Sequence, residues 1–283
     1  MHILVSTGSL PWLGLEDRFR LIAEAGADGV ELLLDRRLLR RDPRELAAQA
    51  QRLGVPIRSV HAVLHLTRES TSQEVRDSAR FARALPDCEV LVVHPPRRLE
   101  RVREWYLALQ EGRTTGDRRL ALAAETLGQH SRADRPVPFD SLDHFLRFTE
   151  EWDLGIVFDV AHAASLGWDL AGALRRCRPR LVNVHVSDAL DRNFRLVLAN
   201  ALIRDHRLPG TGRLPLAELL QMLRRSSYGG NVTLELSPLL LFAPRKRSVR
   251  ERLARAVATV RSYAEDRSSR SRTSRRGTTP DTH

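Results

Sequence analysis

Short apolar runs alternate with amphipathic segments along most of the chain. The runs are rich in Val, Ile and Leu without polar alternation, which is typical of strands buried on both faces. Between the runs, apolar residues recur three and four positions apart, as Leu15, Phe19 and Ile22 do, and predict helices. The predicted strands are 3–5, 30–33, 56–61, 90–94, 120–125, 155–159, 181–185 and 230–235.

A predicted helix follows each strand. Asp42 can cap a helix that begins at Pro43, and Gly54 can end it. Eight strand–helix units within residues 1–265 predict a single α/β domain, a (β/α)8 TIM barrel, rather than an open doubly wound sheet. The predicted helices lie near 15–23, 43–53, 73–85, 102–111, 142–148, 168–176, 214–225 and 249–263.

Two stretches depart from this repeat. Residues 188–213 are a long interval between units, and they predict an extended loop in which Gly210 and Gly212 allow closure over the mouth or close approach of a substrate. Residues 266–283 are rich in Ser, Thr and Arg. Their composition predicts a disordered basic tail after the barrel domain.

Composition narrows the functional classes. The chain of 283 residues is 42% hydrophobic, enough for a large core. Its net charge is +11, and almost all of its positively charged residues are arginines. The arginines are spread along the sequence, which fits a solvated surface better than a focused nucleic-acid patch, although nucleic acid stays a secondary candidate partner. The first loop, Ser6 to Ser9, lacks the glycine-rich dinucleotide fingerprint, so no nucleotide cofactor is expected.

The expected environment is the cytoplasm. The two cysteines, Cys88 and Cys177, exclude a disulfide scaffold and a thiolate zinc finger, and they fit a reducing compartment. We see no apolar run long enough to cross a bilayer and no signal-peptide pattern, so no membrane contact is expected.

Residues that can bind a metal stand at the carboxyl ends of six predicted strands. In a barrel these ends meet at one mouth, where active sites are built. A single His or Asp there is usually structural, but six such residues are hard to explain in that way. Clustered carboxylates repel unless a cation or a proton compensates, and a mixed carboxylate–imidazole set suits zinc, manganese, iron or cobalt. The six residues are His61, His94, Glu125, Asp159, His185 and Glu235.

Four more polar residues lie near these strand ends. His162 follows Asp159 by three positions, and Asp188 follows His185 by three. His206 lies in the long loop. Glu31 ends the second strand and is a candidate for binding an arginine of the mouth or the substrate.

The order and spacing of these motifs resemble the xylose isomerase-like barrel superfamily, which joins sugar isomerases and epimerases to the AP endonuclease family 2. The resemblance covers residues 2–263. It is carried by Val60-His61-Ala62, Val93-His94-Pro95, Glu125, Phe158-Asp159-Val160-Ala161-His162, His185-Val186-Ser187-Asp188, His206 to Gly212, and Glu235.

The isomerase and epimerase branch implies one divalent metal, Mn, Zn, Co or Mg, held by Glu125, Asp159, His185 and Glu235. The metal would polarise a substrate carbonyl and hydroxyl, while Glu125 and Glu235 exchange the proton on carbon. The expected substrate is a small sugar, keto-sugar or polyol derivative. Whether the chain works alone or as a homodimer stays open.

The same resemblance assigns substrate binding to histidines. His162 would bind substrate oxygens, and His61 and His206 are further candidates for that role. These three histidines, together with His94, are equally candidates for binding additional metal ions.

The nuclease branch implies three zinc ions at nine ligand positions, of which this chain matches eight. The ninth should be an Asp two residues before His206, but Arg204 stands there and Asp205 comes one residue late. Asp205 could substitute only after a local shift. An AP-endonuclease-like phosphodiesterase is therefore the alternative, and a non-catalytic sugar-binding barrel is the third possibility. The eight matches are His61, His94, Glu125, Asp159, His162, His185, His206 and Glu235.

Overall fold

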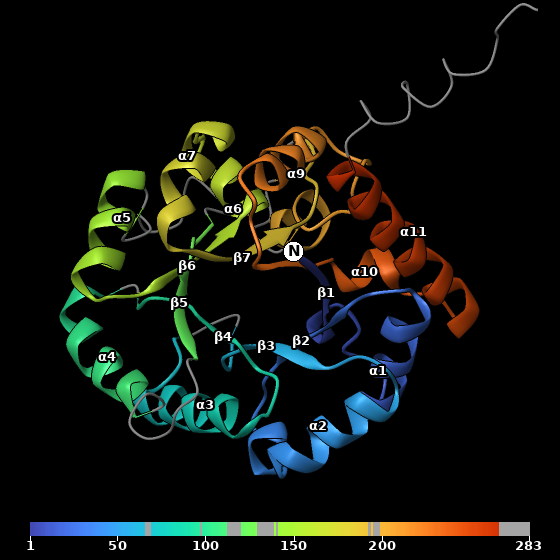
Figure 1. Cartoon of the computed structure of the whole chain (residues 1–283), viewed down its shortest axis with the longest axis horizontal. Helices are drawn as coiled ribbons and strands as arrows, with labels where there is room; N and C mark the ends of the chain where they lie inside the picture. Colours follow the sequence, from blue (N-terminus) through green and yellow to red (C-terminus); the bar gives the residue numbers. More distant parts are fainter. Residues whose placement is uncertain are drawn as a thin grey trace, which may run out of the picture.

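The predicted strands form one closed parallel barrel in a computed structural model of the chain (Figure 1). Each strand pairs with the next in sequence, and β8 closes the barrel against β1 with Thr233 opposite Leu4. The structure describes residues 1–65, 69–96, 98–111, 120–128, 139, 141–191, 194 and 199–265. The strands are β1 His2–Ser6, β2 Gly29–Leu33, β3 Ile57–His61, β4 Val90–Val93, β5 Ala121–Glu125, β6 Gly155–Asp159, β7 Leu181–Val186 and β8 Asn231–Leu234.

Helices surround this barrel as an outer ring (Figure 1). The (β/α)8 architecture predicted from the sequence is therefore confirmed. The helices are α1 Leu15–Glu24, α2 Pro43–Arg52, α3 Ser72–Ala84, α4 Val102–Gln110, α5 Leu142–Glu151, α6 Val160–Ser165, α7 Leu170–Cys177, α9 Leu216–Arg225, α10 Pro238–Leu241 and α11 Lys246–Ala264. Among the described residues, no helix has the length and apolar composition needed to cross a membrane.

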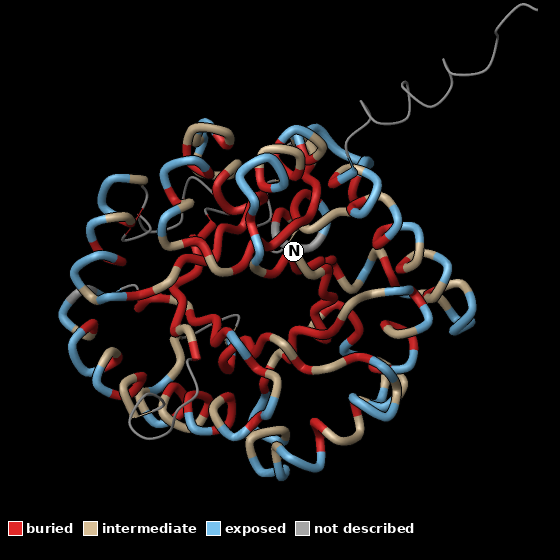
Figure 2. The backbone as a smooth tube through the Cα atoms, viewed as in Figure 1, coloured by how far each residue is buried: buried red, intermediate tan, exposed pale blue. Residues whose placement is uncertain are grey.

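The barrel wall separates two cores. Its outer face packs on the helices and forms one large apolar cluster, and Figure 2 shows the buried positions along the wall and on the inner sides of the helices. Inside the barrel lies a small separate cluster of Val90, Val92, Ala123 and Val157. Since side chains alternate along a strand, the residue two positions after Ala123 or Val157 also faces the interior.

The sequence pattern does not predict two short helices, α6 and the four-residue α10. The six-residue helix α6 begins directly after β6, where the Asp159 carboxylate accepts a hydrogen bond of 2.7 Å from the backbone N–H of His162. A helix of fewer than two turns is too short to show helical periodicity. In the sequence pattern Asp159 stands at a strand end, so its capping role is not apparent. The predicted helix 168–176 is present as α7, which begins two residues later and ends one residue later.

The predicted long loop contains defined structure where the chain is described. Asn200–Arg204 forms a π-helix, η5, and Asp188 pairs with Arg207 in an antiparallel bridge. The Asp188 carboxylate accepts hydrogen bonds from four backbone N–H groups, at 2.9 to 3.0 Å. Two of these donors are Gly210 and Gly212, and a Cβ at Gly212 would lie 2.3 Å from an Asp188 oxygen. The glycines therefore let the segment close on Asp188.

The end of the chain is only partly described. Helix α11 ends at Ala264, close to the predicted domain boundary at residue 265. The predicted basic tail, residues 266–283, lies outside the described residues.

We expect Asp188→Ala to destabilise the fold by about 3 kcal/mol, because it removes the buried carboxylate that accepts from four backbone N–H groups, one of them buried and three partly buried. The melting temperature measured by calorimetry should fall by roughly 6–12 °C. The matched control is Asp191→Ala, which removes an exposed carboxylate paired with Arg213 in the same loop. The control should melt within about 2 °C of the unchanged protein, since exposed ion pairs contribute little. Equal melting temperatures for Asp188→Ala and the control would contradict this role.

Candidate functional site

The strand-end residues predicted from the sequence come together at the mouth of the barrel. Glu125 ends β5 and Asp159 ends β6, two positions after the interior residues Ala123 and Val157. His185 lies on β7. The parallel arrangement places all three carboxyl ends at the same side of the barrel.

Eight predicted residues gather into three overlapping groups, each able to hold a metal ion. Within a group the potential ligand atoms all lie within 4.8 Å of one another. Glu125 and Asp159 each belong to two groups, so they join the three groups into one cluster. The groups are Glu125–Asp159–His185–Glu235, His61–His94–Glu125, and Asp159–His162–His206.

The four-residue group has the character of a cation site. His185 Nδ1 lies 2.8 Å from Glu235 Oε2 and 3.3 Å from Glu125 Oε1. Despite these short separations, His185 Nδ1 and Glu235 Oε2 have no hydrogen-bond partner among the described residues, and Asp159 Oδ2 is likewise unpartnered there. Buried polar atoms that face a common point without bonding one another are the arrangement a bound cation would satisfy.

Glu125 is the centre of a ring of imidazoles. Its Oε2 lies 3.0 Å from both His61 Nε2 and His94 Nε2, and its Oε1 lies 3.4 Å from His162 Nδ1. The other ring nitrogen of His61 is 2.8 Å from the Ala62 carbonyl oxygen. Because a carbonyl only accepts, this nitrogen carries a proton, and only after losing its proton on Nε2 can His61 direct a lone pair at the cluster.

Backbone contacts fix the orientation of His162. Its Nδ1 lies 2.9 Å from the Thr126 carbonyl oxygen. Gly128 packs directly on the ring, and a Cβ there would come within 2.5 Å of the imidazole carbon Cδ2. The absence of a side chain at Gly128 thus allows the segment after β5 to lie against His162.

The carboxylates of the cluster raise the pKa of three neighbouring imidazoles, whereas burial lowers that of a fourth, His94. Burial favours the neutral ring, but the hydrogen bond and charge of Glu125 outweigh it and raise the pKa of His61 to about 9. Burial is likewise outweighed by the charges of Asp159 and Glu125, which raise the pKa of His162 to about 10. The pKa of His185 is raised for the same reason, against burial, by Glu31 and Glu125.

The three carboxyl groups of the four-residue group differ in the direction of their pKa shifts. Burial disfavours ionisation of Glu125, but the nearby His185 and His94 hold its pKa well below the ordinary value. Burial at Glu235 is overcome by the close approach and charge of His185, 2.8 Å away, which lower the pKa of Glu235 to about 2. Burial dominates at Asp159 and raises its pKa. The pKa values of Glu125 and Glu235 are therefore lowered by the imidazoles beside them, whereas that of Asp159 is raised.

The position of the ninth zinc ligand holds an ion pair instead. The Arg204 guanidinium donates to both oxygens of Asp205, at 2.8 and 2.7 Å, and both residues are buried. Among the described residues, Asp205 joins none of the three ligand groups. His206 keeps its place in the third group, with its ring centroid 5.2 Å from that of His162.

The sequence suggests an arginine of the mouth or the substrate as the partner of Glu31, but among the described residues its partners are other polar side chains of the barrel. It is fully buried, and its Oε2 accepts hydrogen bonds from Ser59 and Asn183 and lies 3.2 Å from His185 Nε2. The other two partners were not recognised from the sequence. Ser59 and Asn183 are small polar residues inside apolar runs, a weak signal that becomes visible only when inward positions are known.

Access to the cluster differs between its members. The side chains of Glu235 and His94 are 25% and 29% exposed, whereas that of Glu125 is 1% exposed. Glu235 and His94 therefore face the open mouth.

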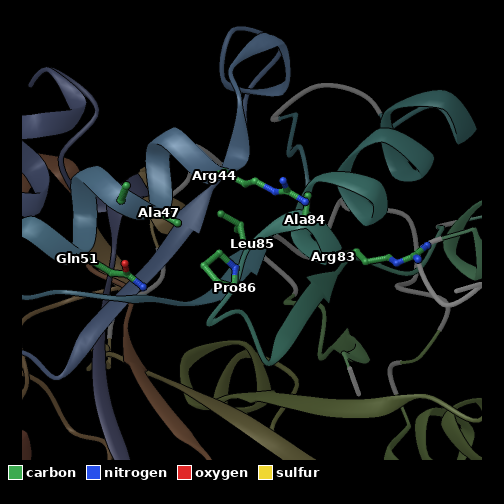
Figure 3. A pocket seen from close by; sticks show the side chains of 8 residues that line it. Arg44, Ala47, Gln51, Arg83, Ala84, Leu85 and Pro86 are labelled. Carbon is green, nitrogen blue, oxygen red and sulfur yellow. The ribbon is translucent and has the colours of Figure 1, made fainter. Parts of the chain in front are cut away.

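A separate hollow of about 450 Å³ between α2 and α3, lined by Gln51, Arg83 and Pro86 among others, shares no residue with the ligand groups (Figure 3).

Known proteins share this fold over nearly the whole chain. A D-psicose 3-epimerase from Clostridium cellulolyticum H10, solved with D-tagatose, is similar with a TM-score of 0.70 and 15% identity, over 94% of this chain and 100% of its own. A 3-keto-D-glucoside 4-epimerase from E. coli gives a TM-score of 0.64 and 21% identity, over 91% and 99%. An uncharacterized protein of Mycobacterium tuberculosis is 27% identical over 262 residues, 82% of this chain and 88% of its own.

The structural similarities, at these identities, establish a common fold. The family model of the xylose isomerase-like TIM barrel matches residues 19–257, which is most of the chain. The resemblance inferred from the order of the motifs is confirmed, and the chain belongs to the xylose isomerase-like TIM barrel family.

Proposed function

We propose that this protein is a divalent-metal-dependent isomerase or epimerase of a small sugar, keto-sugar or polyol derivative. The observation that carries the proposal is the four-residue group Glu125–Asp159–His185–Glu235, with its unpartnered buried atoms. The donor set of three carboxylates and one imidazole suits manganese, zinc, cobalt or magnesium. Two similar structures are sugar epimerases by name, which supports a sugar-like substrate.

A divalent cation at this group would supply Lewis-acid polarisation of a substrate carbonyl. The chain's own carboxylates would then move the proton. Glu235 is ionised and faces the mouth, so its carboxylate can accept a proton from a carbon next to the carbonyl. Glu125 lies deeper in the site and would return a proton to the other side of that carbon, a proton that it must first take from a neighbouring protonated imidazole such as His162.

The histidines would orient the substrate. His162 is held by Thr126 and Gly128, and its protonated ring can donate to a substrate oxygen. His61 and His206 occupy the flanking ligand groups and are proposed to contact other substrate oxygens. Rings fixed in this way lose little freedom on binding, which favours a productive orientation.

Glu125→Gln should reduce exchange of a substrate C–H with solvent deuterium by at least about 100-fold, because the amide cannot accept the proton. The exchange is followed by mass spectrometry on a panel of free and phosphorylated ketoses, in metal-supplemented D2O. Metal content is measured in the same samples, so that lost metal is not mistaken for lost chemistry. The control Glu89→Gln, an exposed carboxylate paired with Arg58, should exchange normally. Full exchange by metal-loaded Glu125→Gln would contradict the assigned role.

Metal affinity should rise with pH between about pH 6 and pH 9, since a cation must displace protons that the raised pKa values hold on the cluster. Raised histidine pKa values mean that protons are bound at neutral pH and released as pH increases, so metal competes best at high pH. Titration calorimetry with Mn²⁺ in buffers of different ionisation enthalpy should report net proton release. Affinity that is flat or falls with pH would contradict the proposed ligands.

A second candidate is a multi-zinc phosphodiesterase related to the AP endonucleases. The observation that favours it is the presence of the two histidine-rich groups, His61–His94–Glu125 and Asp159–His162–His206, beside the first. The Arg204–Asp205 pair leaves the third group without a further carboxylate among the described residues. This difference places the nuclease second.

Elemental analysis of protein purified without chelator should find one divalent ion per chain if the isomerase proposal is right. Two or three zinc ions would instead favour the phosphodiesterase and call for an assay on abasic duplex DNA. His94 belongs only to the histidine-rich group around Glu125, so His94→Ala should leave a stoichiometry of one unchanged but lower a multi-zinc stoichiometry by one. The control His65→Ala removes a histidine bonded to Glu74 outside the cluster.

A further inference from the structure

A buried carboxylate below the ligand cluster has no role in the chemistry described so far. Glu31 lies on β2, points into the barrel and has no exposed surface. It reaches across the interior to β7, where it meets Asn183 and His185. One of its oxygens, Oε1, has no hydrogen-bond partner.

Three groups converge on the other oxygen. Glu31 Oε2 accepts from Ser59 Oγ at 2.7 Å and from Asn183 Nδ2 at 2.9 Å, and it lies 3.2 Å from His185 Nε2. Thr233 Oγ1 donates to Asn183 Oδ1 at 3.1 Å, which fixes the direction of the Asn183 amide. The network thus spans β2, β3, β7 and β8 and presents Oε2 as an acceptor only.

We propose that Glu31 is the positioning residue of the metal site: it keeps the proton of His185 on Nε2 and thereby presents Nδ1 to the cation. A carboxylate can only accept, so His185 Nε2 must donate to it. Nδ1 is the nitrogen that lies 2.8 Å from Glu235 and 3.3 Å from Glu125. The inference rests on the proposed metal-dependent function and assigns it a residue that contacts neither metal nor substrate.

Packing alone does not account for Glu31. A fully buried carboxylate with one unpartnered oxygen is unfavourable, and an apolar side chain of similar size would fill the same space. Interior positions on other strands, Val90, Val92, Ala123 and Val157, are apolar. A carboxylate that orients a ligating imidazole and raises its basicity explains why this position is polar.

The test compares Glu31→Gln with the unchanged protein and with Glu74→Gln. The amide keeps the shape and one acceptor oxygen but loses the charge. Glu74 is the matched control because it is a buried carboxylate 3.0 Å from His65 Nε2, outside every ligand group. Mn²⁺ affinity is measured by titration calorimetry, and the melting temperature is measured on the metal-free proteins.

We expect Glu31→Gln to weaken Mn²⁺ binding by about 10- to 100-fold without lowering the metal-free melting temperature. Glu74→Gln should bind Mn²⁺ as the unchanged protein does. Long-range ¹H–¹⁵N spectra of the Zn²⁺-loaded, unchanged protein should show His185 protonated on Nε2 and bound through Nδ1. Ser59→Ala, which removes one donor to Glu31 and keeps the carboxylate, should weaken binding less, and it provides the affinity test if Glu31→Gln does not fold.

Equal Mn²⁺ affinity of Glu31→Gln and the unchanged protein would overturn the inference and leave the metal-dependent function standing. A Zn²⁺-loaded protein with His185 bound through Nε2 would do the same. A lower melting temperature with unaltered affinity would show a purely structural role and also overturn it. An unchanged protein that binds none of Mn²⁺, Zn²⁺, Co²⁺ and Mg²⁺ would overturn the proposed function together with the inference.

Discussion

The charge of three carboxyl groups in one nearly closed space is the constraint on which the site depends. Glu125, Asp159 and Glu235 face one another at the mouth of the barrel, and little water screens the first two, which are buried. Such a group is stable only if protons or a cation balance it. In the structure the balance comes from protonated imidazoles, above all that of His185, which lies within 4.0 Å of all three carboxylates.

The barrel supports this charged interior because its stability comes from elsewhere. The large apolar cluster lies between the strands and the surrounding helices, and only a small apolar cluster fills the barrel itself. The inward positions can therefore become polar toward the mouth. On β5 and β6 the inward side chain changes from apolar to acidic between two successive inward positions, Ala123 and Glu125, and Val157 and Asp159. Backbone groups after β5, at Thr126 and Gly128, then fix the ring of His162.

The long segment after β7 carries the residues in which this site departs from the nuclease pattern of the same family. The Asp188 carboxylate accepts hydrogen bonds from backbone N–H groups of this segment and so fixes its conformation. His206, in the same segment, lies in the cluster. The same segment places Arg204 where a nuclease-like site would need a carboxylate. A fold shared by epimerases and endonucleases is thus adapted by a few residues at the mouth, as is usual for this architecture.

The sequence by itself determined the eight strand–helix units and the residues at the strand ends, because buried parallel strands are short continuous apolar runs, whereas amphipathic helices repeat their apolar residues every three to four positions. It could not show the short helix α6, which spans less than two turns. Only the tertiary structure decided which strand-end residues share a group, since this depends on register and on distances across the barrel. It also gave Glu31 its partners: Ser59, Asn183 and His185 are far apart in sequence, and their meeting is a consequence of barrel closure.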